Sequence, residues 1–421
     1  EEAEKAEKGV AEEMEEKKEE EQRGGEGGVR KILAFSLLFL IFSILVGCAS
    51  GYPINITDSA GRNVTIKAPI KKIIVLNSDA AEAVKVLGRV ESIVGVTDSV
   101  KKKSYYFPEL QDKETVGTWK EFDYEKIAEL AKNETTGRND PTLVITYTFK
   151  LEPAEKLEGI ENITVVAFDF CKEEKLSEEV EKLGEMLGAE ERANDFINWW
   201  REKRAAVEDA VSESISTESI SEDELANEIL SYLRATYLGT TEGHLDLERL
   251  RRHAWFYAYG SKPWVFIEGT AKGLEDIATK GNGSADHATC TLAGGYNIAG
   301  ELGGAYPHVS WEWVLERNPD VIIKGVYTSG WGWSGVEEPA ELVEDIKSRP
   351  GADSIFAVKD NRVYAFCNEI LYGMDSVVGL TYWAKIFHPS AKLNPKEVYT
   401  EYLEFMNLTY PEDRIFVYPE V

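Results

Sequence analysis

Cys48 is the residue whose surroundings point most directly to a chemical modification. It ends the sequence Leu45-Val46-Gly47-Cys48, which closes an apolar run over 32–46 that follows Arg30-Lys31. A basic segment, an apolar segment and a small residue before the cut are typical of a secretory signal. The run is shorter than the roughly 20 apolar residues of a membrane span. We therefore predict that the chain is cleaved before Cys48 and that its thiol receives a diacylglycerol.

The alternative for this stretch is an uncleaved anchor helix with an incidental cysteine at its end. On either interpretation, the chain that follows Cys48 lies outside the cell and is tethered to the outer face of the cytoplasmic membrane. The segment 1–28 is rich in Glu, Lys, Ala and Gly, and it has no apolar face to bury. Such a composition predicts a disordered leader.

A second set of residues has the types that hold a flat or apolar ligand. In open α/β sheets, ligands bind beyond the carboxyl ends of strands, and each aromatic side chain there can bury roughly 150–250 Å². Position after an expected strand selects Asn77, Ser78, Asp79, Thr97, Asp98, Tyr147, Phe149, Glu268, Tyr327, Trp331 and Trp333. We predict ligand contacts from Asn77, Ser78, Tyr147, Glu268, Tyr327, Trp331 and Trp333.

Each of these predictions has a structural alternative. Asn77 and its two neighbours are equally well explained as helix caps, because short polar side chains accept hydrogen bonds from the first free amides of a helix. The two tryptophans lie in the run Ser-Gly-Trp-Gly-Trp-Ser-Gly over 329–335. We interpret this run as too flexible to belong to the core, which favours ligand contact.

Residues that would capture a bare metal ion or catalyse a reaction do not occur at the required spacing. The sequence has no HxH or HExxH spacing among its histidines, and His287 and His308 are the two nearest the expected cleft. This pattern disfavours a Zn²⁺ or Mn²⁺ site, which needs a few converging nitrogen and oxygen donors. A nucleophile elbow, a P-loop and a dinucleotide-binding glycine motif are also missing. We expect no catalytic residues, no resident metal and no cofactor.

Composition excludes nucleic acid as a partner. The 421 residues carry a formal net charge of −28, whereas phosphate binding needs clustered Lys and Arg. The cysteines after Cys48 are Cys171, Cys290 and Cys367. Three cysteines can form at most one disulfide among themselves, and their spacing is not that of a metal or redox motif.

Two stretches of alternating strand and helix patterns predict two α/β lobes. Short apolar runs at 72–76, 93–96, 143–146 and 164–168 read as buried parallel strands, and further runs follow at 264–269, 321–324 and 362–366. A helix is expected over 177–187, and a longer one over 190–211 could cross from one lobe to the other. Closing helices are expected over 382–387 and 396–405. The predicted fold is therefore two Rossmann-like lobes, joined by a single long helix, with a ligand cleft between them.

These patterns give the following division of the chain. We expect a leader at 1–28, a lipoprotein signal at 29–47, an N-terminal lobe at 48–189, an interlobe helix at 190–211, a polar insertion of unknown role at 212–262 and a C-terminal lobe at 263–421.

An internal repeat sets two glutamates at matching places in the two lobes. Asp123-Tyr124-Glu125 in the first lobe corresponds to Ser310-Trp311-Glu312 in the second, and each stretch leads through an apolar helix and a proline to a buried strand. Each motif is a cap residue, an aromatic and a Glu. The simplest role for such a Glu is compensation of the helix dipole; repetition in both lobes favours a shared function.

The chain resembles the substrate-binding proteins of iron-siderophore, haem and cobalamin ABC importers, the class III periplasmic binding proteins. The segments that carry this resemblance, in order and together with the Cys48 motif, are 58–66, 117–127, 292–299, 309–323 and 358–364. The resemblance implies that Trp119 contacts the ligand. It also implies that Glu125 and Glu312 dock on arginines of the permease, and that a metal chelate is held between the lobes.

We therefore expect a lipid-anchored solute-binding protein that delivers a metal chelate to the transmembrane subunits of an ABC permease. A ferric siderophore is the first candidate, and cobalamin or haem the next. Three alternatives remain open: a cell-surface adhesion glycoprotein, a binding protein for a solute that is not a chelate, and one for a bare metal ion. Acidity and several N-x-S/T sequons allow an adhesion protein, but adhesion modules are usually all-β.

Overall fold

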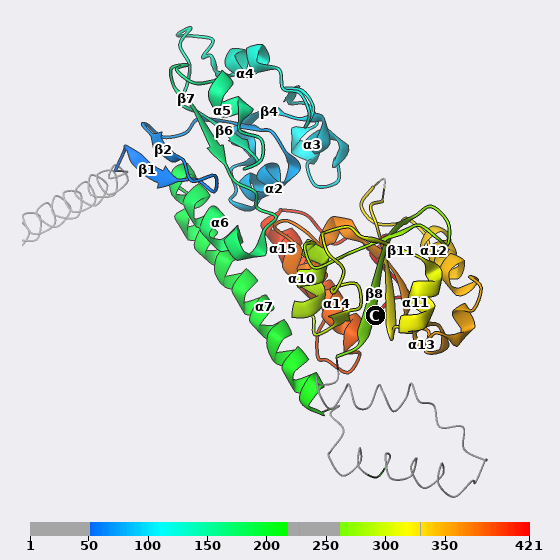
Figure 1. The fold of residues 1–421 in the computed structure, drawn as a ribbon. Helices are drawn as coiled ribbons and strands as arrows, with labels where there is room; N and C mark the ends of the chain where they lie inside the picture. The colour runs from blue at the N-terminus through cyan, green and yellow to red at the C-terminus, as the bar shows by residue number, and fades with distance from the viewer. Residues whose placement is uncertain (1–50, 218–226, 228–261, 329) are drawn as a thin grey trace, which may run out of the picture. The chain divides into compact units, whose positions relative to one another are not determined.

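The computed structural model describes residues 51–217, 227, 262–328 and 330–421 (Figure 1). Two α/β lobes, each built on its own sheet, make up this part of the chain, as the strand patterns predicted. The predicted leader, signal and Cys48 lie outside the described residues, and so does most of the predicted insertion.

The sheet of the N-terminal lobe is entirely parallel. Neighbouring strands pair in the order β5-β4-β3-β6-β7. Their bounds are Glu114–Thr115 for β5, Ile93–Val96 for β4, Lys72–Val75 for β3, Thr142–Thr146 for β6 and Ile163–Ala167 for β7. Every residue of β6 is buried, which is why a continuous apolar run predicts a strand covered on both faces.

Two helices of this lobe, α2 (Ser78–Val86) and α4 (Tyr124–Ala131), begin at side-chain caps. Asn77 accepts a hydrogen bond from the amide of Ala80 at 2.7 Å, and Asp123 accepts one from Lys126 at 2.9 Å. Such caps satisfy amides that have no partner within the helix. The helices of this lobe are α2 (Ser78–Val86), α3 (Asp98–Lys102), α4 (Tyr124–Ala131), α5 (Glu152–Lys156) and α6 (Glu173–Leu187).

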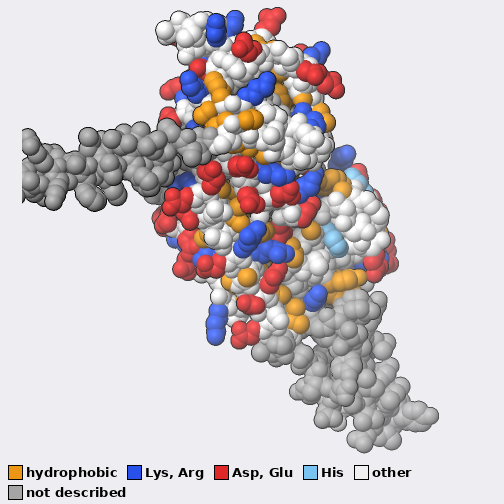
Figure 2. Space-filling model, turned by 90° about the vertical axis from the view of Figure 1, so that its left-hand side faces the viewer, with side chains coloured by type: hydrophobic (Ala, Val, Ile, Leu, Met, Phe, Trp, Pro, Cys, Tyr) orange, Lys and Arg blue, Asp and Glu red, His pale blue; other side chains and the backbone are white. Residues whose placement is uncertain are grey.

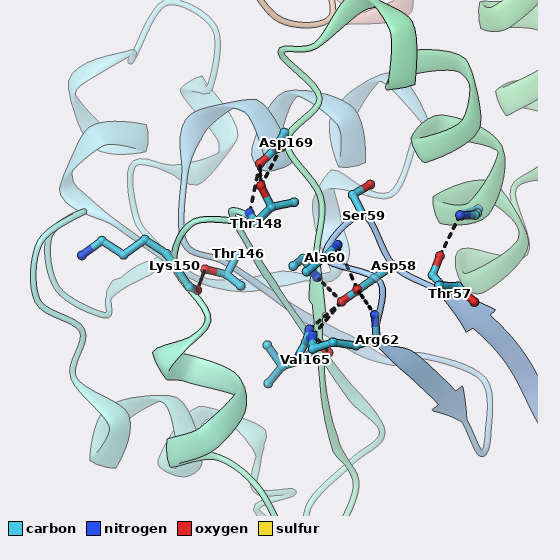
Figure 3. A network of polar contacts seen from close by, with 12 residues as sticks. Thr57, Asp58, Ser59, Ala60, Arg62, Thr146, Thr148, Lys150, Val165 and Asp169 are labelled. Carbon is cyan, nitrogen blue, oxygen red and sulfur yellow. Dashed lines mark hydrogen bonds and ion pairs between the residues drawn. The ribbon is translucent and has the colours of Figure 1, made fainter.

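A hairpin of β1 (Ile54–Thr57) and β2 (Asn63–Ile66) is fastened to the parallel sheet through Asp58 (Figure 3). The Asp58 carboxylate accepts the amides of Ala60 and Arg62 within the turn at 3.1 and 2.9 Å, and it accepts the amide of Ala167 at 3.1 Å. Arg62 pairs with the same carboxylate at 2.6 Å and also donates to the carbonyl of Val165. One buried carboxylate therefore fixes both the turn and its place beside β7.

The sheet of the C-terminal lobe is mixed. The order is β11-β9-β8-β12-β13-β14, with β10 pairing β8, and the central strands β8, β12 and β13 run parallel. The flanking strands β9, β11 and β14 pair antiparallel to their neighbours. The bounds are Trp264–Ala271 for β8, Ile277–Thr279 for β9, Tyr296–Asn297 for β10, His308–Val309 for β11, Val321–Val326 for β12, Val363–Cys367 for β13 and Val417–Tyr418 for β14.

The helices of this lobe are α10 (Ala285–Leu292), α11 (Trp311–Arg317), α12 (Glu337–Lys347), α13 (Phe356–Lys359), α14 (Ser376–Phe387) and α15 (Pro395–Phe405). Helix α14 begins six residues before the helix expected over 382–387, and all but two of its residues are buried. Because it is apolar on every side, its first turns show no helical periodicity in the sequence.

A single long helix, α7 (Glu190–Thr217), connects the two sequence halves (Figure 1). It begins where the sequence predicted and continues past the expected end at 211. Gly188 makes the sharp entry possible, because it ends α6 in the left-handed conformation with φ 60°. Helix α7 packs against α6 and also against α14. Among the described residues, no helix is long and apolar enough to cross a membrane.

Charged side chains of both signs are interspersed on the face shown in Figure 2. No broad basic patch is visible on this face of the described part of the chain.

Candidate functional site

The loop after β6 is held in place by hydrogen bonds at both of its ends (Figure 3). The hydroxyl of Thr146 donates to the carbonyl of Lys150 at 2.9 Å. The amide and hydroxyl of Thr148 donate to the carboxylate of Asp169 at 3.0 and 2.9 Å. This bonding fixes the segment 147–150 at the carboxyl end of the sheet, where α/β proteins bind ligands.

Tyr147 and Phe149 project from this loop as a stacked pair. Their ring centroids lie 4.9 Å apart with an interplanar angle of 16°. The hydroxyl of Tyr147 donates to Asp79 at 2.7 Å, and burial together with the Asp79 charge raises the pKa of Tyr147. Phe149 is 69% exposed, so the pair offers a rigid aromatic surface with one open side.

Trp119 lies in the turn that follows β5, and two lysines lie near its ring. Its indole is 53% exposed. The ammonium groups of Lys120 and Lys150 lie 5.3 and 5.8 Å from the indole centroid, within the range of a cation–π interaction. Lys150 also donates to the carbonyl of Lys120 at 3.3 Å. The Trp119 turn and the β6 loop therefore form one cationic, aromatic surface on the N-terminal lobe.

The C-terminal lobe has an open pocket of about 630 Å³ at the carboxyl ends of β8 and β12. Its lining includes Tyr306, Tyr327, Lys280, Lys324 and Asn368. The two tyrosines are 67% and 70% exposed. The pocket therefore offers aromatic rings and hydrogen-bond donors at the strand ends.

Lys280 links two of the aromatic side chains on this lobe. Its ammonium lies 5.1 Å from the ring centroid of Tyr306 and 3.3 Å from the carboxylate of Asp286. Asp286 in turn hydrogen-bonds the hydroxyl of Tyr372, and burial raises the pKa of that phenol. Asp286 is buried, so it fixes the positions of Lys280 and Tyr372.

The prediction that Glu268 contacts a ligand is not supported by its surroundings. Glu268 is fully buried in β8. Its carboxylate pairs with Lys324 at 2.8 Å and with Arg349 in a bidentate pair at 2.7 and 2.9 Å. Both of its carboxylate oxygens accept hydrogen bonds from cations of the same lobe, which is the arrangement of a structural residue.

Trp333 is also a core residue. It is 2% exposed, and its backbone exchanges hydrogen bonds of 2.9 Å with Ile415. The expectation that the run 329–335 is too flexible for the core is therefore wrong at Trp333. Gly332 permits the close approach, because it has φ 68° and a Cβ there would lie 2.7 Å from the carbonyl of Ile415.

Trp331 lies at a contact between the lobes. Its ring stacks on Tyr105 of the N-terminal lobe, with centroids 5.6 Å apart and an interplanar angle of 14°. Its indole N–H donates to the hydroxyl of Tyr399 at 2.6 Å. Asn77 and Ser78 belong to the start of α2, where Asn77 is the buried cap. Asn77 is therefore a helix cap, which is the alternative role that its sequence position allowed.

Of the predicted ligand residues, Trp119, Tyr147 and Tyr327 lie at strand ends with accessible rings. Reasoning from sequence did not select Lys120, Lys150, Lys280, Tyr306 and Tyr372. Lys120 and Lys150 could have been found from their closeness in sequence to Trp119 and Phe149. The other three gave no local signal, because their neighbours come from separate segments.

Glu125 and Glu312 occupy equivalent positions in the two lobes. Each is the second residue of its helix, α4 or α11, and each is exposed. The caps are equivalent too, since Ser310 accepts from the amide of Trp313 at 3.2 Å as Asp123 does from Lys126. Within the described residues, neither carboxylate belongs to an ion pair, so both are available to an external cation.

The described residues contain no group of three or more His, Cys, Asp or Glu side chains that could hold a metal ion. Cys171, Cys290 and Cys367 are all free thiols. The thiols of Cys171 and Cys290 are buried enough that their pKa values rise, to about 12 for Cys171, which disfavours the reactive thiolate form.

The sequence matches the model of a known protein family. The model of the family described as periplasmic binding protein matches residues 73–221 and 270–369, which together are more than half of the chain. The matched ranges include β3 to α7 of the first lobe and most of the second sheet. A comparison with curated protein sequences gives no match.

Several solved structures have the same fold. The TroA-like periplasmic binding protein FepB from Veillonella parvula has a TM-score of 0.64 at 20% identity, over 87% of this chain and 99% of that one. The molybdate-bound periplasmic protein MolA from Haemophilus influenzae has a TM-score of 0.57 at 20% identity, over 85% and 99%. A periplasmic haem-binding protein from Pseudomonas aeruginosa has a TM-score of 0.50 at 18% identity, over 77% and 95%.

Proposed function

Because the chain belongs to the periplasmic binding protein family, whose members are solute-binding proteins of ABC transporters and not enzymes, we propose that it captures a metal chelate and delivers it to an ABC permease. A ferric siderophore is the first candidate, with cobalamin and haem next. The protein is held at the outer face of the cytoplasmic membrane by a lipid on Cys48. The permease contacts it through Glu125 and Glu312.

The observation that carries the ligand class is the pairing of exposed aromatic rings with lysines at strand ends. Trp119 lies near Lys120 and Lys150 on one lobe, and Tyr306 lies beside Lys280 on the other. Aromatic faces bury large apolar areas of a flat ligand, while lysines attract negative charge. Together they suit a chelate with aromatic or planar parts and a net negative charge.

The similar structures support a fold that serves several ligands. One is a haem-binding protein and another was solved with molybdate. A haem is a flat chelate, whereas molybdate is a small oxyanion. The wide aromatic surface of Trp119, Tyr147 and Phe149 fits the first kind of ligand better, because an oxyanion needs few apolar contacts.

The direct test is calorimetric titration of the full chain with ferric siderophores, haem and cobalamin, and with Zn²⁺ as a bare ion. We expect tight binding of one chelate and none of Zn²⁺. Tight binding of Zn²⁺ with no response to any chelate would refute the ligand class.

Trp119→Ala should weaken binding of the chelate identified in this way. Truncating a central aromatic contact costs about 2 kcal/mol, which is roughly a 30-fold increase in Kd. Calorimetry measures the change without depending on tryptophan emission. Trp313→Ala is the matched control, because Trp313 also has a cation over its ring, Arg317 at 3.8 Å, but lies on α11. Equal Kd values for the wild type and Trp119→Ala would remove Trp119 from the site.

Cys48→Ala should release the protein from membranes. In a host that has the lipidation enzymes, the wild type is expected in the membrane fraction and the variant in the soluble fraction. Metabolic labelling with a fatty acid should mark the wild type alone. Equal fractionation of the two proteins would show that the apolar run over 32–46 anchors the chain without Cys48.

A further inference from the structure

Two hydrogen bonds cross between the lobes at fully buried sites. Tyr106 of the N-terminal lobe donates to the carboxyl group of Asp375 in the C-terminal lobe at 2.8 Å. In the opposite direction, Tyr402 on α15 donates to the carboxyl group of Glu82 on α2. None of these four side chains is more than 2% exposed. Each lobe therefore contributes one carboxyl group and one tyrosine to the same contact.

The contact continues through further aromatic residues. The hydroxyls of Tyr106 and Tyr399 lie 2.6 Å apart, and Trp331 donates to Tyr399 at 2.6 Å. The second carboxyl oxygen of Asp375 is buried without a hydrogen-bond partner among the described residues. An unpartnered buried oxygen is costly when charged, so protonation of Asp375 lowers the free-energy cost of burying its carboxyl group.

Charged groups of both signs face the two carboxyl groups. Glu82 is faced by Asp79 and Lys85 from its own helix, by Lys103 from the segment after α3 and by Tyr402 from α15. Asp375 is faced by Glu82, Lys103 and Tyr106. Lys103 also faces Asp79 and Glu369, and Lys85 is already bound by the carbonyl of Tyr106 at 2.6 Å and by Glu109 at 3.0 Å.

Burial has the largest effect on both carboxyl groups. It raises the pKa of Glu82 to about 7, against the opposing effects of Lys103 and the Tyr402 hydrogen bond. It also raises the pKa of Asp375 well above the usual range, and the neighbouring charge of Glu82 adds to this rise. At least one proton is therefore held by the pair when the lobes are in contact near neutral pH.

We propose that Glu82 and Asp375 form a proton-dependent lock between the two lobes. A protonated carboxyl accepts a tyrosine hydroxyl without burying a charge, and so it stabilises the contact. When the pair is fully ionised, two carboxylates remain buried close to one another. Separation of the lobes then gains free energy, because water reaches both groups.

The direction of the pH effect follows from linkage. Burial raises the pKa of Glu82 from its ordinary value of 4.5 to about 7 in the contact, so closing the contact takes up a proton. The stabilisation that Glu82 contributes is fully present below the lower value, is lost as pH rises between the two values and is absent above about 7. For one proton, the equilibrium constant for opening rises up to tenfold per pH unit in this window.

The lock shares elements with the candidate ligand site. Asp79 binds Tyr147 and also faces Glu82. Trp331 and Tyr327 belong to the same loop after β12. Opening or closing this contact therefore moves residues of both lobes that the proposed ligand would touch. We expect acid pH to favour the arrangement in which the lobes are in contact.

Hydrogen exchange of the full chain tests the lock. Protection of the segments 98–110 and 395–406 is measured at about pH 5.5 and about pH 8 and corrected for the intrinsic exchange rate at each pH. In the wild type, the opening constant should be at least tenfold larger at the higher pH. Glu82→Gln, which keeps the shape and the acceptor but cannot ionise, should lower that ratio, because only Asp375 of the pair can then take up a proton.

Glu179→Gln is the matched control. Glu179 is also a buried glutamate whose pKa burial raises, but its partners Ser59, Asp169 and Phe170 all lie in the N-terminal lobe. Its variant should keep the pH dependence of the wild type. Loss of that dependence in Glu179→Gln, no pH dependence in the wild type, or an unchanged ratio in Glu82→Gln would each overturn the proposal.

Infrared spectroscopy gives a second readout that does not depend on a stable Glu82 variant. The wild type should show a band from a protonated, hydrogen-bonded carboxyl group that disappears as pH rises through about 7. Asp375→Asn should shift the midpoint of this band downward, because it removes the neighbouring negative charge. A wild-type spectrum without such a band above about pH 5.5 would overturn the lock.

Discussion

Transport through the cognate permease should fall at least tenfold when Glu125 and Glu312 are both changed to glutamine, while the affinity for the ligand stays the same. Both carboxylates are exposed at the second residue of a helix. If each meets an arginine of the permease, removal of one charged partner costs about 2 kcal/mol or more in docking. Uptake by vesicles that contain the permease measures the first effect, and calorimetry measures the second.

Glu129 and Glu316 provide a matched control for this pair. They lie one turn further along the same two helices, α4 and α11, and both are exposed. The double change to glutamine there alters the charge equally and should leave uptake close to that of the wild type. A similar loss of uptake in both double variants would indicate a general effect of negative charge instead of two specific contacts.

The competing explanation for Glu125 and Glu312 is compensation of the helix dipole. This role predicts a loss of about 0.3–1 kcal/mol in stability for each change and no effect on transport. Thermal unfolding separates the two roles. Normal uptake by the double variant would leave dipole compensation as the function, and a large loss of ligand affinity would place these carboxylates in the ligand site.

Glu268→Ala should destabilise the C-terminal lobe by about 3–5 kcal/mol, because it leaves two buried cations without their anion. Lys324 and Arg349 both pair with Glu268, and their side chains are 13% and 7% exposed. Burial opposes the charge of Arg349, yet hydrogen bonds to Glu268 and Asp345 raise the pKa of its guanidinium. The free energy of unfolding in urea is the measurement.

Asp345→Ala is the control, because it removes an exposed anionic partner of Arg349 instead of the buried one. Asp345 pairs with Arg349 at 2.8 Å, but its side chain is 71% exposed. Exposed ion pairs contribute about 0–1 kcal/mol, so this variant should unfold close to the wild type. If Glu268→Ala instead kept its stability and lost ligand affinity, the sequence-based prediction of a ligand contact at Glu268 would be right and its structural role wrong.

Local sequence patterns determined most of the secondary structure. The apolar runs that became β3, β4 and β6 are buried along almost their whole length, so no competing pattern obscured them. The start of α7 at Glu190 was readable because Gly188 interrupts the preceding helix. The equivalence of Glu125 and Glu312 could also be predicted from the sequence. Each follows the cap residue of a helix, and a cap involves residues only three positions apart.

Tertiary structure decided which polar and aromatic residues are accessible. Glu268 and Tyr327 both follow the strand-end rule, but Glu268 is buried by partners that lie 56 and 81 residues away in the sequence, Lys324 and Arg349. Trp333 is in the core because Ile415 pairs with its backbone. The contact of Tyr106 with Asp375 joins residues 269 positions apart. The sequence carries the side-chain chemistry and the local caps, whereas burial and ion pairing depend on partners that only the folded chain brings together.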